Sequence, residues 1–332
     1  MKVGIVGLPN VGKSTLFHLL TKQAVVIANY PFATIDPNVG VTPVPDERLE
    51  KLAAMSNSAK KVPAIIEFYD IAGLVKGAYK GEGLGNQFLS HIREVQTIVH
   101  VVRLFGAADI LHVEQGVDPL RDIDIINTEL ILKDLETVTK RKEKLEGEAR
   151  AGKAEAIHNL AVLKSIEEAL NNQTLAISLG ADTLAELILK ELFLLSAKPQ
   201  IYLLNGASEE VTDELKARLA SLKADYMVAD LQAEKGVGDI IRKAYAVLGL
   251  ISFLTTGEDE SRAWTIKKGM KAPEAAGVIH TDFEKKFIRA EVIQWEKLLE
   301  ATSWQKARQK GWLRVEGKQY EVQDGDVIEF KI

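Results

Sequence analysis

The first fifteen residues contain a spacing that can bind the phosphates of a nucleotide. Gly7 and Gly12 are followed directly by Lys13 and Ser14, in the pattern G-x-x-x-x-G-K-S. Glycines let a backbone turn tightly and approach a phosphate, and successive amides at the start of a helix favour an anion. The lysine of such a loop reaches the terminal phosphates, and the serine hydroxyl is a ligand for Mg²⁺. We therefore predict that this loop binds a nucleoside triphosphate.

A proline-containing stretch further along fits the first switch segment of a nucleotide hydrolase. Residues 27–40 carry two prolines and little helical periodicity, which predicts an exposed loop entering a strand at 39–44. Thr34 lies in this loop, between the phosphate-binding loop and the next acidic strand end. At that position we expect Thr34 to bind Mg²⁺ and to contact the γ-phosphate.

An apolar run that ends in a carboxylate supplies the acidic group. Residues 64–70 predict a buried strand, and Asp70 begins a D-x-x-G pattern that ends at Gly73. After a buried strand this pattern places a carboxylate behind Mg²⁺ and a glycine amide at the γ-phosphate. Leu74 then stands where Ras-like enzymes carry the glutamine that orients the attacking water. Either another group orients that water, or intrinsic turnover is slow.

The glycine-rich stretch 76–89 predicts the second switch, whose order depends on the γ-phosphate. Because a helix is expected directly after it, at 87–96, we favour this interpretation over a flexible linker. The predicted catalytic residues are Lys13, Thr34 and Gly73; the predicted Mg²⁺ ligands are Ser14 and Thr34, with Asp70 behind them.

The surrounding elements alternate between strands and helices, as is typical of a doubly wound sheet. Strands are expected at 3–6, 39–44, 64–70, 98–103, 201–204 and 226–229, and the first helix at 14–20. The ends of the last two strands, at 205–209 and 230–234, are where such a sheet reads its base. His100 lies inside a strand, so we interpret it as a packed core histidine and not as a catalytic base.

A long charged insertion separates the fourth of these strands from the fifth. Its apolar residues recur at three- and four-residue spacing on either side of a glycine-flanked tip at 147–152. This pattern predicts an antiparallel helical hairpin with a narrow apolar seam. A solvated packing arm and a partner-docking arm both fit it. The seam residues are Ile131, Leu135, Val138, Leu145, Ala149, Ala156, Leu160, Leu163 and Leu170.

From residue 251 onward the sequence changes to short strands and turns. Strands are expected at 251–255 and 262–266, turn-rich chain at 277–285 and a helix at 287–299. The dipeptide Asp324-Gly325 separates 319–322 from 327–332, which predicts a terminal hairpin.

Composition bounds the protein class. The 332 residues suffice for two or three domains, and 46% hydrophobic with 27% charged residues is typical of a soluble globular chain. No apolar run approaches a membrane helix, and the first strand leaves no room for a signal peptide. The absence of cysteine excludes disulfides and thiolate metal sites. A net charge of -5 argues against general coating of nucleic acid.

Several long runs are similar to the YchF-type Obg-like ATPases, and the similarity covers essentially the whole chain. These runs are GLPNVGKST at 7–15, YPFATIDPN at 30–38, DIAGLVKGA at 70–78, GEGLGNQFL at 81–89, NTEL at 127–130, RAWT at 262–265 and GVIHTDFEK at 277–285. The resemblance implies an α/β fold with three parts. These are an OBG-type, Ras-like P-loop G domain of the TRAFAC class at 1–248, an antiparallel coiled-coil arm inserted at 127–196, and a C-terminal TGS domain of β-grasp (ubiquitin-like) shape at 249–332.

The resemblance also implies an activity and partners. This family hydrolyses ATP in preference to GTP, needs Mg²⁺ and associates with the ribosome or its large subunit. It replaces the catalytic glutamine with a hydrophobic residue, which Leu74 matches. We therefore expect a cytoplasmic, monomeric, Mg²⁺-dependent ATPase that acts as a slow switch in translation or stress regulation. Its turnover should rise with the ribosome or with K⁺, and we expect neither a membrane nor a DNA partner.

The nucleotide-binding residues follow from matched positions. They are Asn10, Val11, Gly12, Lys13, Ser14 and Thr15 in the phosphate loop, and Asn205, Gly206 and Ala207 at the base. GTPases usually carry N-K-x-D at the base, and this family carries N-x-x-E. Here Ser208 takes the fourth place, and Glu209 follows one residue later. GTP specificity is therefore not expected, while the group that selects adenine stays open.

Two alternatives remain. The chain could be a ribosome-linked GTPase with an atypical base loop, or a module that binds ribosome or RNA regardless of nucleotide. Competition between ATP and GTP separates the first alternative from an ATPase. Ribosome co-sedimentation of a Lys13→Ala variant separates the second.

Overall fold

The computed structural model describes residues 2–22, 38–71, 92–106, 116–179, 188, 191–233 and 236–332. Within these residues the chain forms two compact units. Unit 1 contains the described residues up to Gly40 and from Glu67 to Val237, and unit 2 contains Val41–Ile66 and Gly238–Ile332. Among the described residues no helix is both long and apolar enough to cross a membrane.

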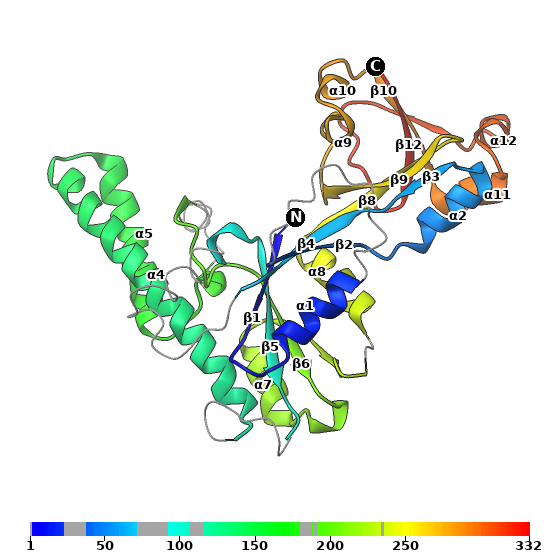
Figure 1. Cartoon of the computed structure of the whole chain (residues 1–332). Helices are drawn as coiled ribbons and strands as arrows, with labels where there is room; N and C mark the ends of the chain where they lie inside the picture. The colour runs from blue at the N-terminus through cyan, green and yellow to red at the C-terminus, as the bar shows by residue number, and fades with distance from the viewer. Residues whose placement is uncertain are drawn as a thin grey trace. The chain divides into compact units, whose positions relative to one another are not determined.

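A six-stranded sheet with the order β2-β4-β1-β5-β6-β7 carries the predicted nucleotide motifs (Figure 1). The neighbouring pairs β4–β1, β1–β5, β5–β6 and β6–β7 are parallel. Its strands are β1 (Lys2–Val6), β2 (Val39–Pro43), β4 (Ile65–Asp70), β5 (Thr97–Arg103), β6 (Gln200–Asn205) and β7 (Asp225–Ala229). β5 and β6 are buried throughout, as expected of central strands covered on both faces. All six predicted strands are confirmed.

The helices of unit 1 are α1 (Lys13–Lys22), α4 (Pro119–Arg150), α5 (Ala154–Asn171) and α7 (Asp213–Ser221), with short 3-10 turns η3 (Ala176–Leu179) and η4 (Ser208–Glu210). The first helix of unit 1 lies close to its predicted position, whereas α4 begins earlier than the predicted arm and α7 was not predicted. Ile92 to Glu94 are helical, and the rest of the helix expected at 87–96 lies outside the described residues.

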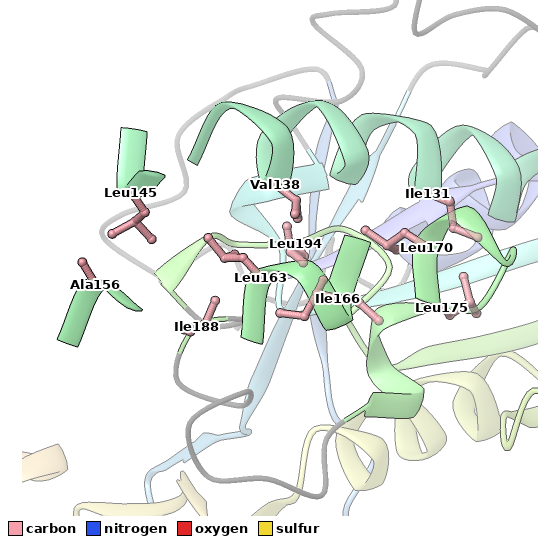
Figure 2. Close-up of a cluster of buried hydrophobic side chains, with 11 residues drawn as sticks. Ile131, Val138, Leu145, Ala156, Leu163, Ile166, Leu170, Leu175, Ile188 and Leu194 are labelled. Carbon is pink, nitrogen blue, oxygen red and sulfur yellow. The ribbon is translucent and has the colours of Figure 1, made fainter. Parts of the chain in front are cut away.

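α4 and α5 form the predicted helical hairpin and lie side by side (Figure 1). Figure 2 shows their shared seam, in which Val138 and Leu145 of α4 face Leu163 and Ala156 of α5. The helix continues through Gly147 to Arg150, so the tip is shorter than the sequence predicted. Leu175, Ile188 and Leu194 extend the seam where the chain leaves the hairpin.

Unit 2 contains a second sheet, with the order β11-β10-β12-β8-β9-β3. β8 and β9 form an antiparallel hairpin, and β12 lies parallel to β8 at the centre, which is the β-grasp arrangement. The strands are β3 (Lys60–Val62), β8 (Leu250–Thr256), β9 (Glu260–Lys267), β10 (Arg289–Gln294), β11 (Arg314–Glu316) and β12 (Asp326–Lys331). The helices are α2 (Glu47–Ser56), α8 (Val237–Val247), α9 (Ala272–Ile279), α10 (Thr281–Lys285), α11 (Trp295–Ala301) and α12 (Trp304–Gln309).

Unit 2 contains a segment that the division by sequence position did not place there. β3 pairs with β9 in parallel, and α2 lies beside α11, although the two helices are far apart in the sequence (Figure 1). Ser58 Oγ donates to the carbonyl of Gly257 at 2.6 Å. A division drawn along the sequence assumes contiguous domains, and only this pairing reveals the insertion.

Three local predictions for the C-terminal part were wrong. Residues 277–285 are helical and not turn-rich, because Ala272, Ala275 and Ala276 form a buried helical stripe just before them. The helix predicted at 287–299 is β10 followed by α11, since Ala290 and Val292 alternate into the core with a strand period.

The predicted terminal hairpin is the third wrong prediction. β12 pairs with β10 and β8, whereas 319–322 makes one isolated bridge, between Glu321 and Lys271. Gly325 does turn the chain, with φ of +82°. Its amide donates to the carbonyl of Ser252 on β8, so the turn delivers β12 to the sheet centre and not to the preceding residues.

Candidate functional site

The phosphate-binding loop joins the carboxyl end of β1 to α1 and has the backbone shape its glycines predict. Gly7 and Gly12 have φ of +152° and +107°, which side chains rarely tolerate. A Cβ at Gly12 would lie 2.4 Å from the amide nitrogen of Asn205. α1 begins at Lys13, so its unpaired first-turn amides lie at the loop, where they favour an anion.

Lys13 and Asp70 carry the charge of the loop. The Lys13 ammonium donates to the carbonyl of Leu8 at 2.8 Å, and the side chain is 8% exposed. Burial lowers the pKa of Lys13 to about 8, and the charge of Asp70 opposes that shift. Burial likewise raises the pKa of Asp70, and the charge of Lys13 opposes it. Asp70 ends β4 and pairs in register with Ile5 of β1. The Lys13 ammonium and the Asp70 carboxylate therefore both lie beside the phosphate-binding loop.

Asn205 connects the phosphate loop to two other loops. It is buried at the carboxyl end of β6. Its amide nitrogen donates to the carbonyl of Val11 at 2.9 Å, and its amide oxygen accepts from the backbone of Leu231 at 3.2 Å. Both ends of the side-chain amide are therefore used inside the protein. Asn205 positions the P-loop and the chain after β7 together.

Gly206 and Ala207 lie in a closed turn. The Ala207 amide donates to the Glu210 carboxylate at 2.8 Å, and a Cβ on Gly206 would lie 2.4 Å from that carboxylate. The amide predicted to contact a base is therefore already bonded to Glu210. The sequence drew attention to Ser208 and Glu209, whereas the carboxylate that folds back onto this loop belongs to Glu210.

A cavity of about 260 Å³ collects most of the predicted binding residues. Its lining consists of Asn10, Gly12, Lys13, Ser14, Thr15, Phe105, Asn205, Leu231 and Gln232. Leu231 and Gln232 lie in the strand-end segment 230–234 that the sequence indicated, although neither was singled out. Phe105 was not predicted as a binding residue. The signal that could have identified it is its position just after β5, at the same edge of the sheet.

The oxygen donors near the loop suit Mg²⁺. Ser14 presents an exposed hydroxyl at the start of α1, and Asp70 offers a carboxylate, both of the oxygen type that Mg²⁺ prefers. Among the described residues no group of three or more histidine, cysteine or acidic side chains could hold a metal. Thr34, Gly73 and Leu74 lie outside the described residues.

His100 is a core residue, as predicted. It is 1% exposed, and its ring centroid lies 5.0 Å from that of Tyr202 on β6. Burial lowers the pKa of His100 to about 3, and the charge of Lys13 acts in the same direction. The imidazole is therefore neutral at physiological pH.

Two family models match separate parts of the chain. Residues 250–332 match YchF-GTPase_C, described as a protein of unknown function (DUF933). Residues 2–141 match MMR_HSR1, described as a 50S ribosome-binding GTPase.

Curated relatives match the chain over almost its full length. The Ribosome-binding ATPase YchF of Bacillus subtilis is 45% identical over 361 residues, covering 100% of this chain and 99% of that protein. Obg-like ATPase 1 of Gallus gallus is 42% identical, with 100% and 92% covered. Among solved structures, the Schizosaccharomyces pombe YchF GTPase superposes with a TM-score of 0.86 at 38% identity, covering 100% of this chain and 97% of that one.

Proposed function

The chain belongs to the YchF family, and on that premise we propose that it hydrolyses ATP to ADP and phosphate in the cavity at the carboxyl edge of the first sheet. The observation that carries the proposal is the pair of hydrogen bonds made by the Asn205 side chain. They connect the phosphate loop to the loop after β7, so one rigid pocket can hold both ends of a nucleotide. The relative from Bacillus subtilis is named an ATPase over the same length of chain.

The residues have separate roles in this proposal. Lys13 binds the β- and γ-phosphates, and the amides of the loop and of α1 neutralise their charge. Asn10, Val11, Gly12 and Thr15 shape the loop, and Asn205 positions the base end. Ser14 and Thr34, with Asp70 behind them, would hold Mg²⁺, which would neutralise charge on the phosphates. Gly73 senses the γ-phosphate, and Gly206 and Ala207 close the base loop.

Slow intrinsic turnover is part of the proposal. Leu74 has no group that can orient a water molecule, and His100 is neutral and buried in the sheet. We expect the rate to rise when a partner such as the ribosome is added, or with K⁺. Fast steady-state hydrolysis by the isolated protein would contradict the switch.

The partner we propose is the ribosome or its large subunit, in the cytoplasm. Two similarities support this partner. The B. subtilis relative is named a ribosome-binding ATPase, and the family model that matches residues 2–141 is described as a 50S ribosome-binding GTPase. We propose that the chain acts there as a monomer that contains an inserted arm at 127–196 and a TGS domain at 249–332.

GTP is the second candidate substrate. The S. pombe structure is titled a GTPase, and in this chain Ser208 replaces the base-reading glutamate that the family resemblance predicts. The test is a side-by-side titration of ATP and GTP against a fluorescent nucleotide, with and without Mg²⁺. Tighter Mg²⁺-dependent binding of ATP supports the proposal. Tighter GTP binding replaces it with the GTPase, and no nucleotide binding at all overturns both.

A further inference from the structure

The cavity lining includes one polar side chain, outside the phosphate loop, whose hydrogen-bonding groups the protein does not use. Gln232 follows the end of β7, is exposed, and lines the cavity together with Phe105, Asn205 and Leu231. Among the described residues the Gln232 carboxamide has no hydrogen-bond partner. A carboxamide carries two N–H donors and an oxygen acceptor. All of these groups are therefore available to a ligand in the cavity.

The backbone at Gln232 is held in place by its neighbours. The Asp230 carboxylate accepts from the Gln232 amide at 2.9 Å, which closes a local turn. The amide of Leu231 donates to the Asn205 side chain at 3.2 Å, and Leu231 is buried. A Cβ on Gly12 would lie 3.2 Å from the Leu231 side chain, so this segment packs against the phosphate loop. The fold therefore fixes the backbone of Gln232 beside the cavity and leaves its side chain unused.

The other polar side chains of the lining have different places or partners. Asn10 and residues 13–15 belong to the phosphate loop and the start of α1. Asn205 uses both ends of its amide inside the protein, toward Val11 and Leu231. Among the described residues that line the cavity, Gln232 is therefore the polar side chain that remains available to the edge of a base.

The chemistry of this lining suits adenine. Within the part of the chain that the structure describes, no acidic side chain lines the cavity. The match between a carboxylate and the N–H groups at N1 and N2 of guanine is therefore missing there. A carboxamide can accept a hydrogen bond from the N6 amino group of adenine and donate one to a ring nitrogen beside it, a pairing that glutamine makes with adenine in nucleic-acid complexes.

We propose that Gln232 is the specificity-determining residue that recognises adenine, through the N6 amino group and the ring nitrogen next to it. This inference rests on the proposed nucleotide function. It also accounts for Ser208, which stands where the family resemblance predicts a base-reading glutamate. When the loop after β7 supplies the group that contacts the base, the loop after β6 needs no acidic side chain for that purpose.

The test measures how strongly the full-length protein distinguishes ATP from purine riboside triphosphate, an analogue that lacks only the N6 amino group. Both ligands compete against a fluorescent nucleotide in the presence of Mg²⁺. The wild type should bind the analogue about fivefold more weakly than ATP, because the bond to the amino group is lost. Gln232→Met keeps an unbranched side chain of similar length without the carboxamide. In this variant the two affinities should come within about twofold of each other.

Two further variants make the comparison specific. Gln309→Met, at an exposed position of α12, is the matched control and should keep the wild-type preference for ATP over the analogue. Gln232→Glu retains an acceptor for the N6 amino group, so it should also keep a preference for ATP over the analogue. Loss of the preference in Gln232→Glu would contradict recognition of the amino group.

The remaining outcomes separate this inference from the proposed function. An unchanged preference in Gln232→Met would overturn the inference, as would a wild type that binds ATP and the analogue equally. Inorganic tripolyphosphate should bind Gln232→Met as it binds the wild type, and an equal loss for all three ligands would assign the effect to the fold and overturn the inference. In each of these cases the wild type still binds ATP, so the proposed function stands. A wild type that binds none of the ligands refutes both.

Discussion

The two ends of the proposed nucleotide pocket, which we call the phosphate end and the base end, are built differently. The phosphate end is made of consecutive residues, because Gly7 to Ser14 comprise the loop after β1 and the first residues of α1. The base end is assembled from three separate strand ends, which bring Phe105, Asn205 and Leu231 together. The first is fixed by local backbone conformation. The second exists only because β5, β6 and β7 pair in register.

Mutations at the two ends should therefore have different effects. Damage at the phosphate end should weaken every polyphosphate ligand by the same factor, whether or not it has a base. Damage at the base end should weaken ATP and spare inorganic tripolyphosphate. Competition of both ligands against a fluorescent nucleotide measures the two effects on the same sample.

The largest effect is expected from Lys13→Met. Removing the ammonium deletes charge-assisted bonds to the phosphates, and the loss of a few such bonds corresponds to about 100-fold in affinity. ATP and tripolyphosphate should weaken alike. Lys216→Met, on the exposed face of α7, is the control and should change neither ligand. A loss confined to ATP would refute the assignment of Lys13 to the phosphate end.

Asn205→Ala should come second and should affect both ends. The change leaves the Val11 carbonyl and the Leu231 amide without their buried partner, at roughly 1–3 kcal/mol each. We expect about 10-fold weaker ATP, a smaller loss for tripolyphosphate, and a lower melting temperature by calorimetry. Asn172→Ala, at the exposed end of α5, serves as the control. Unchanged binding of both ligands would show that the two Asn205 hydrogen bonds do not contribute to ligand binding in the pocket.

Phe105→Ala should be smaller and specific to the base. The ring lines the cavity and is backed by the guanidinium of Arg103, 4.5 Å from its centroid. Stacking of a base on an aromatic ring contributes roughly 1–3 kcal/mol, and the lower end of that range corresponds to ATP binding about 5-fold more weakly. Tripolyphosphate should bind as before. An equal loss for both ligands would mean that the substitution acts through the fold.

His100→Phe tests the strand between the two ends and should have the smallest effect on binding, less than twofold at pH 7.5.

The folded pKa of His100, about 3, is below its ordinary value of 6.5, so the unfolded chain binds the extra proton in acid. Stability should therefore be complete above pH 6.5 and fall as the pH drops. Between pH 7 and pH 5 the loss should be on the order of 2 kcal/mol.

The variant should lose that acid sensitivity, because phenylalanine has no proton to bind. Urea unfolding at both pH values measures the change. An equally acid-sensitive variant would assign the effect to another group.

The phosphate loop, the strands of the first sheet and the helical arm could be predicted from the amino-acid sequence. Each of these depends on short-range rules. Glycine tolerates the φ that Gly12 adopts, apolar runs become buried strands, and three- and four-residue spacing makes the seam of the arm. A pattern that is satisfied within one element can be recognised in that element's residues.

The base end of the pocket and the membership of unit 2 depend on contacts that form only when the whole chain folds. Phe105 carries no motif, and it becomes a pocket residue only through strand pairing. The run 287–299 was predicted as one helix, and pairing of β10 with β12 makes its first part, Arg289–Gln294, a strand. Likewise Asp134 looks like one more charge on a helix until the returning chain covers it. The physical reason is the same in each case: the deciding contact joins residues far apart in the sequence, and local propensity carries no information about it.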